Sequence, residues 1–246
     1  MRSFCHCIRA DFYKFRHTSM LLIHLLLPLG IAAAFLAYYT VSPWKPSAKI
    51  SAYFELIGVS FPLVIGLVCS KAIEQEGQAG SFQNLLCGVK SRAAVWFSKL
   101  TVLLLLGLCS IALAIVVFAV GFQYAPPSVY GKAAALLIAG SLFLYILHLF
   151  VSLKSGRGAS IGLGIVESLL SSLALTGLGD RIWYFLPCTW SARFADSLIF
   201  TWLNPTKSFG SAEIQKGLLF AVPATGIALV LVLLWFRNWE GRKTYD

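Results

Sequence analysis

The stretch LTVLLLLGLCSIALAIVVFAVGF, residues 100–122, runs for 23 residues without a charged side chain. About 20 apolar residues are enough for a helix to cross a hydrocarbon core of about 30 Å. A backbone in lipid must satisfy its hydrogen bonds within its own segment, so such a stretch forms a helix. It therefore predicts a transmembrane helix, and the same pattern recurs along the chain.

Five further stretches have this length and apolar character. The six predicted spans are Met20–Tyr39, Tyr53–Ile73, Leu100–Phe122, Ala133–Leu153, Ala159–Leu178 and Leu218–Phe236. Hydrophobic residues make up 58% of the 246 residues and charged residues 12%, whereas a soluble domain has about 25% charged residues. The sequence thus predicts an all-α integral membrane protein with six transmembrane helices in one domain, residues 1–246.

The charges are distributed unevenly between the two sides of these spans. The chain has 20 Lys and Arg against 10 Asp and Glu. Thirteen of the 20 basic residues fall on one side and seven on the other. The positive-inside rule then places both termini in the cytoplasm. The excess is expected to meet anionic lipid headgroups rather than nucleic acid.

Residues 1–19 precede the first span and predict an amphipathic helix in the membrane interface. Arg2, Arg9 and Arg16 repeat every seven residues and would anchor this helix at the membrane surface. An apolar arc lies opposite them: Phe4, Ile8, Phe12 and Phe15. Asp11 lies near this arc and weakens the pattern. The helix either sets the angle of the first span or docks a cytoplasmic partner.

No metal site is expected. Cys5-His6-Cys7 has ligand residue types, but alternate residues on a helix point well apart and the chain offers no second ligand pair. Small amphipathic-helix residues are the simpler interpretation of this run.

The connection after the second span, residues 74–90, differs from a plain turn. It holds two acids, then glycines, then a short apolar run that Ser81 would cap and Gly88 would end as a helix. An aromatic side chain, Phe82, heads this helix. Such a helix suits a groove on another protein, and a solvated loop with a few buried anchors is the alternative.

Two motifs in the chain resemble those of a known family. The run Glu74-x-Glu76-x-x-x-Gly80-x-Phe82-Gln83-Asn84-Leu85-Leu86 resembles the cytoplasmic coupling segment of ABC-2 type permeases. The run 9–18, RADFYKFRHT, resembles their usual start before the first span. More narrowly, the chain looks like lantibiotic-immunity permeases of the MutE and MutG kind and the related bacitracin-type permeases.

This resemblance implies a transport subunit rather than an enzyme, in a bacterial cytoplasmic membrane. ATP and Mg would be bound by a separate ABC ATPase, in two copies, paired with two permease chains that are identical or paralogous. The chain itself needs no cofactor, and it lacks the G-x-x-x-x-G-K-[ST] run that cradles phosphates. Phe82 would enter a groove of the ATPase, and the acids would meet its basic residues or cap the following helix. The residues expected at this contact are Glu74, Glu76, Gly80, Phe82, Gln83, Leu85 and Leu86.

The connection over 179–217 is rich in aromatic residues and is predicted outside. It resembles the re-entrant helices that related permeases place between their last two spans. Two interpretations are open: an aromatic belt that fixes depth in the membrane, or an outer lid that contacts a cationic amphipathic peptide. The residues concerned are Trp183, Trp190, Arg193, Phe194 and Trp202.

Two ionisable residues lie inside predicted spans. A carboxylate at Glu167 is costly in lipid, so it should face protein or water. It would form an inter-helix hydrogen bond or lie on the substrate path, among small neighbours that suit close helix packing. His148 is expected to be a hydrogen-bonded packing residue rather than a proton relay.

Two functions follow from these observations. In the first, the chain is the permease of an ABC transporter that expels a lantibiotic or bacteriocin-like peptide and so gives self-immunity. In the second, it is an immunity protein that sequesters the peptide in the membrane without ATP. Within the transport interpretation, bacitracin-like or other amphiphiles remain open as substrates.

Overall fold

In a computed structural model, residues 2–16, 18–80, 82–83 and 91–241 are described, and they contain helices and no strand. Helix α3 has 33 residues, which corresponds to about 50 Å. The elements are α1 Arg2–Arg16, α2 Met20–Val41, α3 Pro46–Gln78, α5 Arg92–Gly121, α6 Pro127–Ser155, α7 Arg157–Ala174, η1 Trp183–Phe185, η2 Pro187–Thr189, α8 Trp190–Leu203 and α9 Phe209–Arg237.

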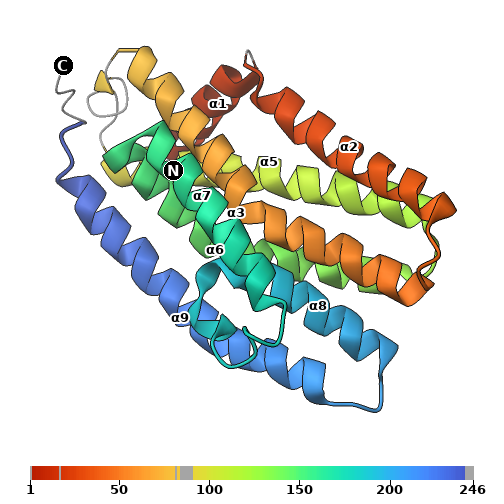
Figure 1. Ribbon diagram of the computed structural model, residues 1–246. Helices are drawn as coiled ribbons and strands as arrows, with labels where there is room; N and C mark the ends of the chain where they lie inside the picture. Colours follow the sequence, from red (N-terminus) through yellow and green to blue (C-terminus); the bar gives the residue numbers. More distant parts are fainter. Residues whose placement is uncertain (1, 17, 81, 84–90, 242–246) are drawn as a thin grey trace.

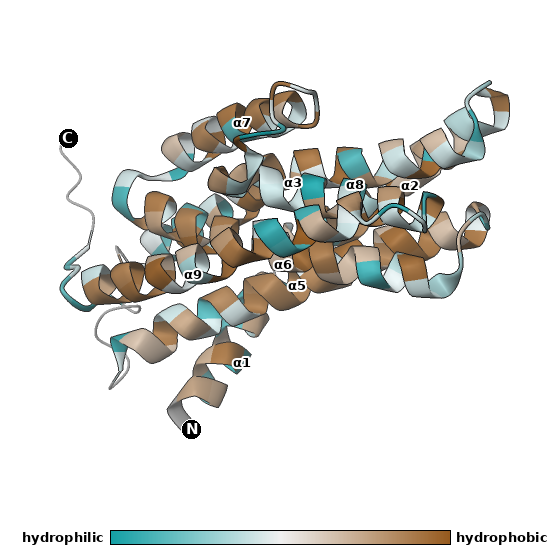
Figure 2. Cartoon of the chain, turned by 90° about the horizontal axis from the view of Figure 1, so that it is seen from below, coloured by the Kyte–Doolittle hydropathy of each residue, from teal (hydrophilic) through white to brown (hydrophobic). Residues whose placement is uncertain are grey.

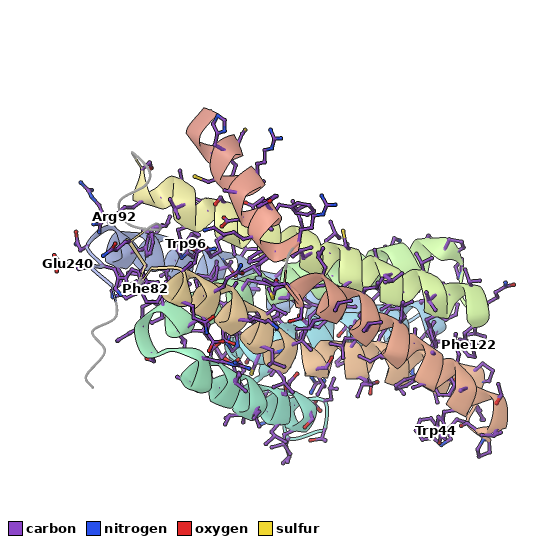
Figure 3. All side chains as sticks on the ribbon, turned by 90° about the horizontal axis from the view of Figure 1, so that it is seen from above. Trp44, Phe82, Arg92, Trp96, Phe122 and Glu240 are labelled. Atoms are coloured by element: carbon purple, nitrogen blue, oxygen red, sulfur yellow. The ribbon has the colours of Figure 1, made fainter. Side chains whose placement is uncertain are left out.

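The long helices lie side by side and give the molecule two distinct ends (Figure 1). One end, called the α1 end below, carries α1, the end of α3, the start of α5 and the end of α9. The opposite end carries the turns from α2 to α3, from α5 to α6 and from α8 to α9. Figure 3 labels Phe82, Arg92 and Glu240 at the α1 end and Trp44 and Phe122 at the opposite end.

Five helices are long and apolar enough to cross a membrane: α2, α3, α5, α6 and α9. Each contains one of the predicted spans, except that the span Leu100–Phe122 runs one residue past Gly121, where α5 ends. Hydrophobic residues predominate along these helices (Figure 2). The remaining predicted span, Ala159–Leu178, falls on α7, which is not among these five and ends at Ala174. The sixth crossing and the direction of the chain across the membrane stay predictions.

Proline, serine and glycine set the limits of several helices. Pro46 and Pro127 occupy the first position of α3 and α6, where a missing N–H costs nothing. Ser91 caps α5, because its Oγ accepts a hydrogen bond from the Ala94 N–H at 3.3 Å. Gly156, with φ of 91°, takes the left-handed conformation that separates α6 from α7.

Buried apolar side chains hold the bundle together in clusters at both ends. Near the opposite end, Tyr53 of α3 stacks on Phe118 of α5 with ring centroids 3.7 Å apart. Helices α2 and α9 are the least covered, since only 17% of the apolar window of each is buried. Their large exposed aliphatic faces are what a lipid-facing helix needs.

Helix α8 packs inside the bundle, against α3, α6 and α9. Two glycines make room for it: a Cβ at Gly58 would lie 2.4 Å from Ala192 Cα, and one at Gly140 would lie 2.6 Å from the Ser191 nitrogen. Helix α7 starts at the α1 end, and α8 ends near the α5–α6 turn, where Trp202 contacts Tyr124. Helices α7 and α8 thus follow one another along the length of the bundle, each covering part of it (Figure 1).

Candidate functional site

A cluster of charged side chains joins α1, α3 and α5 at the α1 end. Lys99 Nζ lies 3.0 Å from Asp11 Oδ1 and 2.9 Å from Glu76 Oε1, and all three residues are buried. Lys14 donates to both oxygens of Glu76, at 2.8 and 3.0 Å, and Ser98 Oγ donates to Asp11 Oδ2 at 2.6 Å. We call these five residues the charged cluster. Its two lysines balance its two carboxylates.

The charged cluster fixes how the helices meet more than it adds stability. Two ions taken out of water lose hydration that their attraction barely repays, but removing one partner strands the other. The position of Asp11 beside the apolar arc of α1 is therefore accounted for, because its carboxylate faces Lys99 rather than lipid. The sequence predicts a role for Glu76 but not for Lys99, whose only local signal is a charge directly before an apolar span.

The predicted coupling segment begins as the last turns of α3. Glu74 pairs with Arg157 of α7, with Oε2 and Nη1 3.0 Å apart on the surface. Gly80, with φ of 127°, ends the helical course, and Gln83 is exposed beyond it. Leu85 and Leu86 lie outside the described residues. The exposed part of the described segment is thus the stretch around Gly80 and Gln83.

Phe82 has a different place from the one expected. Its side chain is 5% exposed, and its ring packs edge-on against Trp239, with centroids 5.3 Å apart. Gly77 allows this, since a Cβ there would lie 3.1 Å from the ring. The ring of Phe82 is thus packed against the permease itself, and its contact with an ATPase stays a prediction. The same is true of Glu76, whose carboxylate is occupied by Lys14 and Lys99.

A second set of polar contacts joins α6 and α7 to α3 within the apolar part of the bundle. His148 Nε2 lies 2.9 Å from Glu167 Oε2, and His148 Nδ1 lies 2.9 Å from Ser160 Oγ. Ser160 Oγ donates to the Gly66 carbonyl at 3.2 Å. Ser168 Oγ accepts the Leu63 N–H at 3.2 Å, next to Pro62 in α3. We call His148, Ser160, Glu167 and Ser168 the polar seam.

The hydrogen bonds of the polar seam have a defined order. The Ser160 hydroxyl donates its one hydrogen to the Gly66 carbonyl, so its oxygen accepts a hydrogen bond from His148 Nδ1–H. His148 Nε2 then forms the second hydrogen bond of the ring, to Glu167 Oε2. Glu167 thus has a protein partner in place of lipid, as a carboxyl group between apolar helices requires. The inter-helix hydrogen bond expected of Glu167 is present.

Close backbone approach makes the polar seam possible. A Cβ at Gly66 would lie 2.8 Å from the Ser160 carbonyl oxygen, and one at Gly164 would lie 2.7 Å from the Pro62 carbonyl oxygen. Gly162, two residues before Gly164 on the same helix, has nothing within 4 Å. Of these two glycines of α7, only Gly164 therefore lies on the face that contacts α3.

Residues 7–171 match the sequence profile of a family described as ABC-2 family transporter protein. This chain belongs to the ABC-2 transporter family. The match covers 165 of the 246 residues and includes both the charged cluster and the polar seam. The chain is accordingly a membrane permease subunit, a transport component rather than a catalyst, and its family implies an ABC ATPase partner. Neither the curated proteins nor the solved structures gave a match.

The aromatic residues after α7 form part of the permease core. Trp183, Trp190 and Phe194 are each no more than 1% exposed. Trp183 Nε1 donates to Glu213 Oε2 at 2.9 Å, which ties this segment to α9. These three residues are therefore not exposed as a belt or lid would be, because they pack in one cluster with residues of α6 and α9.

Arg193 and Trp202 lie nearer the surface of the permease. Arg193 Nη2 lies 2.8 Å from Asp180 Oδ1, and Trp202 is half-buried against Tyr124. Between α7 and α9 the chain forms η1, η2 and α8, so one α-helix and two short 3₁₀ turns occupy the place where a pair of re-entrant helices was expected. Whether they re-enter the membrane stays a prediction.

The amphipathic character of α1 is only partly as predicted. Arg9 and Arg16 are exposed, as a surface anchor requires, and Arg2 lies in the same helix. Of the apolar arc, Phe15 is buried but Phe12 is 50% exposed. The face of α1 that meets the rest of the permease is thus centred on Asp11 and Phe15. Among the described residues, no group of acids, histidines and cysteines has the arrangement of a metal site.

A pocket lies apart from both polar sites, between α2, α3 and α5. Its wall is almost entirely apolar, and Tyr145 of α6 reaches it across Gly107, where a Cβ would clash with the tyrosine hydroxyl. The pocket therefore shares no residue with the charged cluster or the polar seam.

Proposed function

We propose that this permease is driven by a separate ATPase that grips the connection between α3 and α5. The observation that carries the proposal is the position of Lys99. This one side chain is bound to α1 through Asp11 and to the end of α3 through Glu76. A force on the end of α3 would therefore displace α1, α3 and α5 together, since separating a buried ion pair costs several kcal/mol, about 3–5.

The described residues of the connection fall into a buried set and an exposed set. Glu76 and Phe82 face inward and hold the connection against the bundle, whereas Gly80 and Gln83 are exposed. The ATPase would meet the exposed residues and the parts of the segment that follow them. The orientation predicted from charge, with both termini in the cytoplasm, places the α1 end on the side where ATP is hydrolysed.

The proposed cargo is a lantibiotic or bacteriocin-like peptide, expelled from a bacterial cytoplasmic membrane to protect the producing cell. This part rests on the resemblance to immunity permeases. The transporter would contain two ATPase copies and a second permease chain, identical or paralogous. The polar seam would be the element that changes its arrangement, because its hydrogen bonds and close glycine contacts define one particular fit of α7 against α3 and α6, and a second arrangement would have to replace them.

A protection assay with an inactive ATPase tests the transport function. Cells that express the permease and its ATPase are exposed to lantibiotics and to bacitracin, beside cells whose ATPase lacks the phosphate-binding lysine. We expect protection only with the active ATPase. Equal protection with the inactive ATPase would contradict the proposal and favour sequestration of the peptide. Protection against bacitracin alone would retain the transport function and correct the substrate.

A further inference from the structure

A groove between the start of α5 and the end of α9 combines an apolar floor with two guanidinium groups. It is lined by Ser91, Arg92, Ala93, Val230, Leu233, Leu234 and Arg237. Val230, Leu234 and Arg237 recur at helical spacing, so they form one stripe along α9. Val230 and Leu234 are each 56% exposed, and the stripe ends in a cation at the α1 end.

The two arginines carry charge that no described carboxylate neutralises. Arg92 Nη1 donates to the main-chain carbonyls of Arg237 and Trp239, at 3.0 and 2.8 Å, which uses two of its five N–H donors and leaves its charge unpaired among the described residues. The Arg237 side chain is exposed. Among the described residues, neither arginine has an ion pair, and Glu240, the nearest acid in the sequence, pairs with neither. Figure 3 shows Arg92 and Glu240 at this end of the bundle.

The surroundings of the groove indicate which kind of ligand it would bind. Helix α9 is mostly uncovered, so its aliphatic stripe would face lipid tails in a bilayer. The arginines lie where the stripe ends. In a bilayer that covers the stripe, they would therefore lie close to the phospholipid headgroups. Basic pockets between transmembrane helices bind anionic headgroups, and arginine makes a bidentate match to phosphate. A zwitterionic lipid would gain less, because its own cation would approach the same arginines.

We propose that this groove binds one acidic phospholipid. The phosphate lies between Arg237 and Arg92, and one acyl chain follows Val230 and Leu234. Arg92 keeps its two hydrogen bonds to the end of α9 and supplies charge, while Arg237 supplies the direct contact. The lipid would thereby join the end of α9 to the start of α5, the helix that carries Lys99.

Native mass spectrometry of the full-length permease, purified from bilayers of phosphatidylglycerol and phosphatidylcholine, tests the site. We expect the wild-type chain to retain phosphatidylglycerol preferentially. Arg237→Gln lowers this preference about fivefold, the value of one basic residue at a membrane surface, and Arg237→Lys largely keeps it. Lys132→Gln, which removes an exposed charge at the opposite end, leaves it unchanged.

A second variant tests the tail of the site without altering any charge. Val230→Trp fills the apolar stripe at an exposed position and should reduce retention of phosphatidylglycerol while all hydrogen bonds of Arg92 remain. Wild-type retention in both Arg237→Gln and Val230→Trp would overturn the proposal. So would Arg237→Gln chains that keep the lipid but no longer copurify with the ATPase, because the arginine would then belong to a protein contact.

Discussion

Lys99 Nζ lies 2.9 Å from Glu76 Oε1, and each side chain is 3% exposed. Both partners are enclosed, although the pair lies where the connection between α3 and α5 begins rather than in the middle of a core. Its charge-bearing atoms come from residues 23 positions apart, at the end of α3 and the first turns of α5. The geometry makes the pair a rigid link, which leads to a prediction about stability.

Replacing Lys99 by Met should destabilise the permease by about 3–5 kcal/mol, because Asp11 and Glu76 lose their shared cation while buried. Lys14→Met is the matched control. Lys14 is 36% exposed and Glu76 would keep Lys99, so the loss should be about 1 kcal/mol or less. Thermal unfolding in detergent measures both. Equal effects of the two substitutions would show that Lys99 is not the principal partner.

Glu167→Gln should retain most of the stability of the polar seam, whereas Glu167→Ala should lose about 1–3 kcal/mol. The glutamine amide can still form a hydrogen bond with His148 Nε2, whereas alanine leaves that nitrogen buried without this partner. Thermal unfolding separates the two variants. Transport by the glutamine variant gives a second readout: a stable chain that no longer transports would place Glu167 on the substrate path rather than in packing.

Gly164→Ala should cost about 1–3 kcal/mol, because the new methyl group would meet the Pro62 carbonyl oxygen at 2.7 Å. Gly162→Ala, on the same helix, meets nothing within 4 Å and should be neutral or stabilising by up to about 1 kcal/mol. Unfolding of the two single variants in the same detergent checks the contrast. If Gly162→Ala proved the more harmful, α7 would have to present its other face to α3.

Arg157→Gln should barely alter stability, since the pair that Arg157 makes with Glu74 is exposed and such pairs contribute about 1 kcal/mol at most. Glu74→Gln should be equally mild in unfolding but should weaken association with the ATPase, if Glu74 belongs to the coupling contact. Copurification of each variant with the ATPase provides the measurement. Identical ATPase recovery from both variants would remove Glu74 from that contact.

The sequence predicts the elements that are decided by residues close together in the chain. Five predicted spans lie within α2, α3, α5, α6 and α9, except for one residue past the end of α5, because apolar length alone decides them. Glu167 was recognised because a carboxylate in an apolar stretch needs a partner, and His148 supplies it. Asp11 was misjudged as a flaw in α1, since its partner Lys99 lies 88 positions away.

The same limit explains the two corrections. Phe82 stands between Ser81 and Gln83, and Trp183 follows Asp180 and Arg181 in another connection, so both look like surface aromatics in sequence. Their burial depends on Trp239 and on Glu213 of α9, which approach only in the folded bundle. No periodicity within the connections reports those distant contacts.

The most direct test of the central claim is photo-crosslinking from the connection between α3 and α5 in cells that contain the ATPase. A benzoylphenylalanine at exposed Gln83 is compared with one at exposed Trp44, at the opposite end of the bundle. The account predicts that the ATPase is captured from position 83 and never from position 44. Capture from position 44, or from neither position in a complex that still transports, would contradict it.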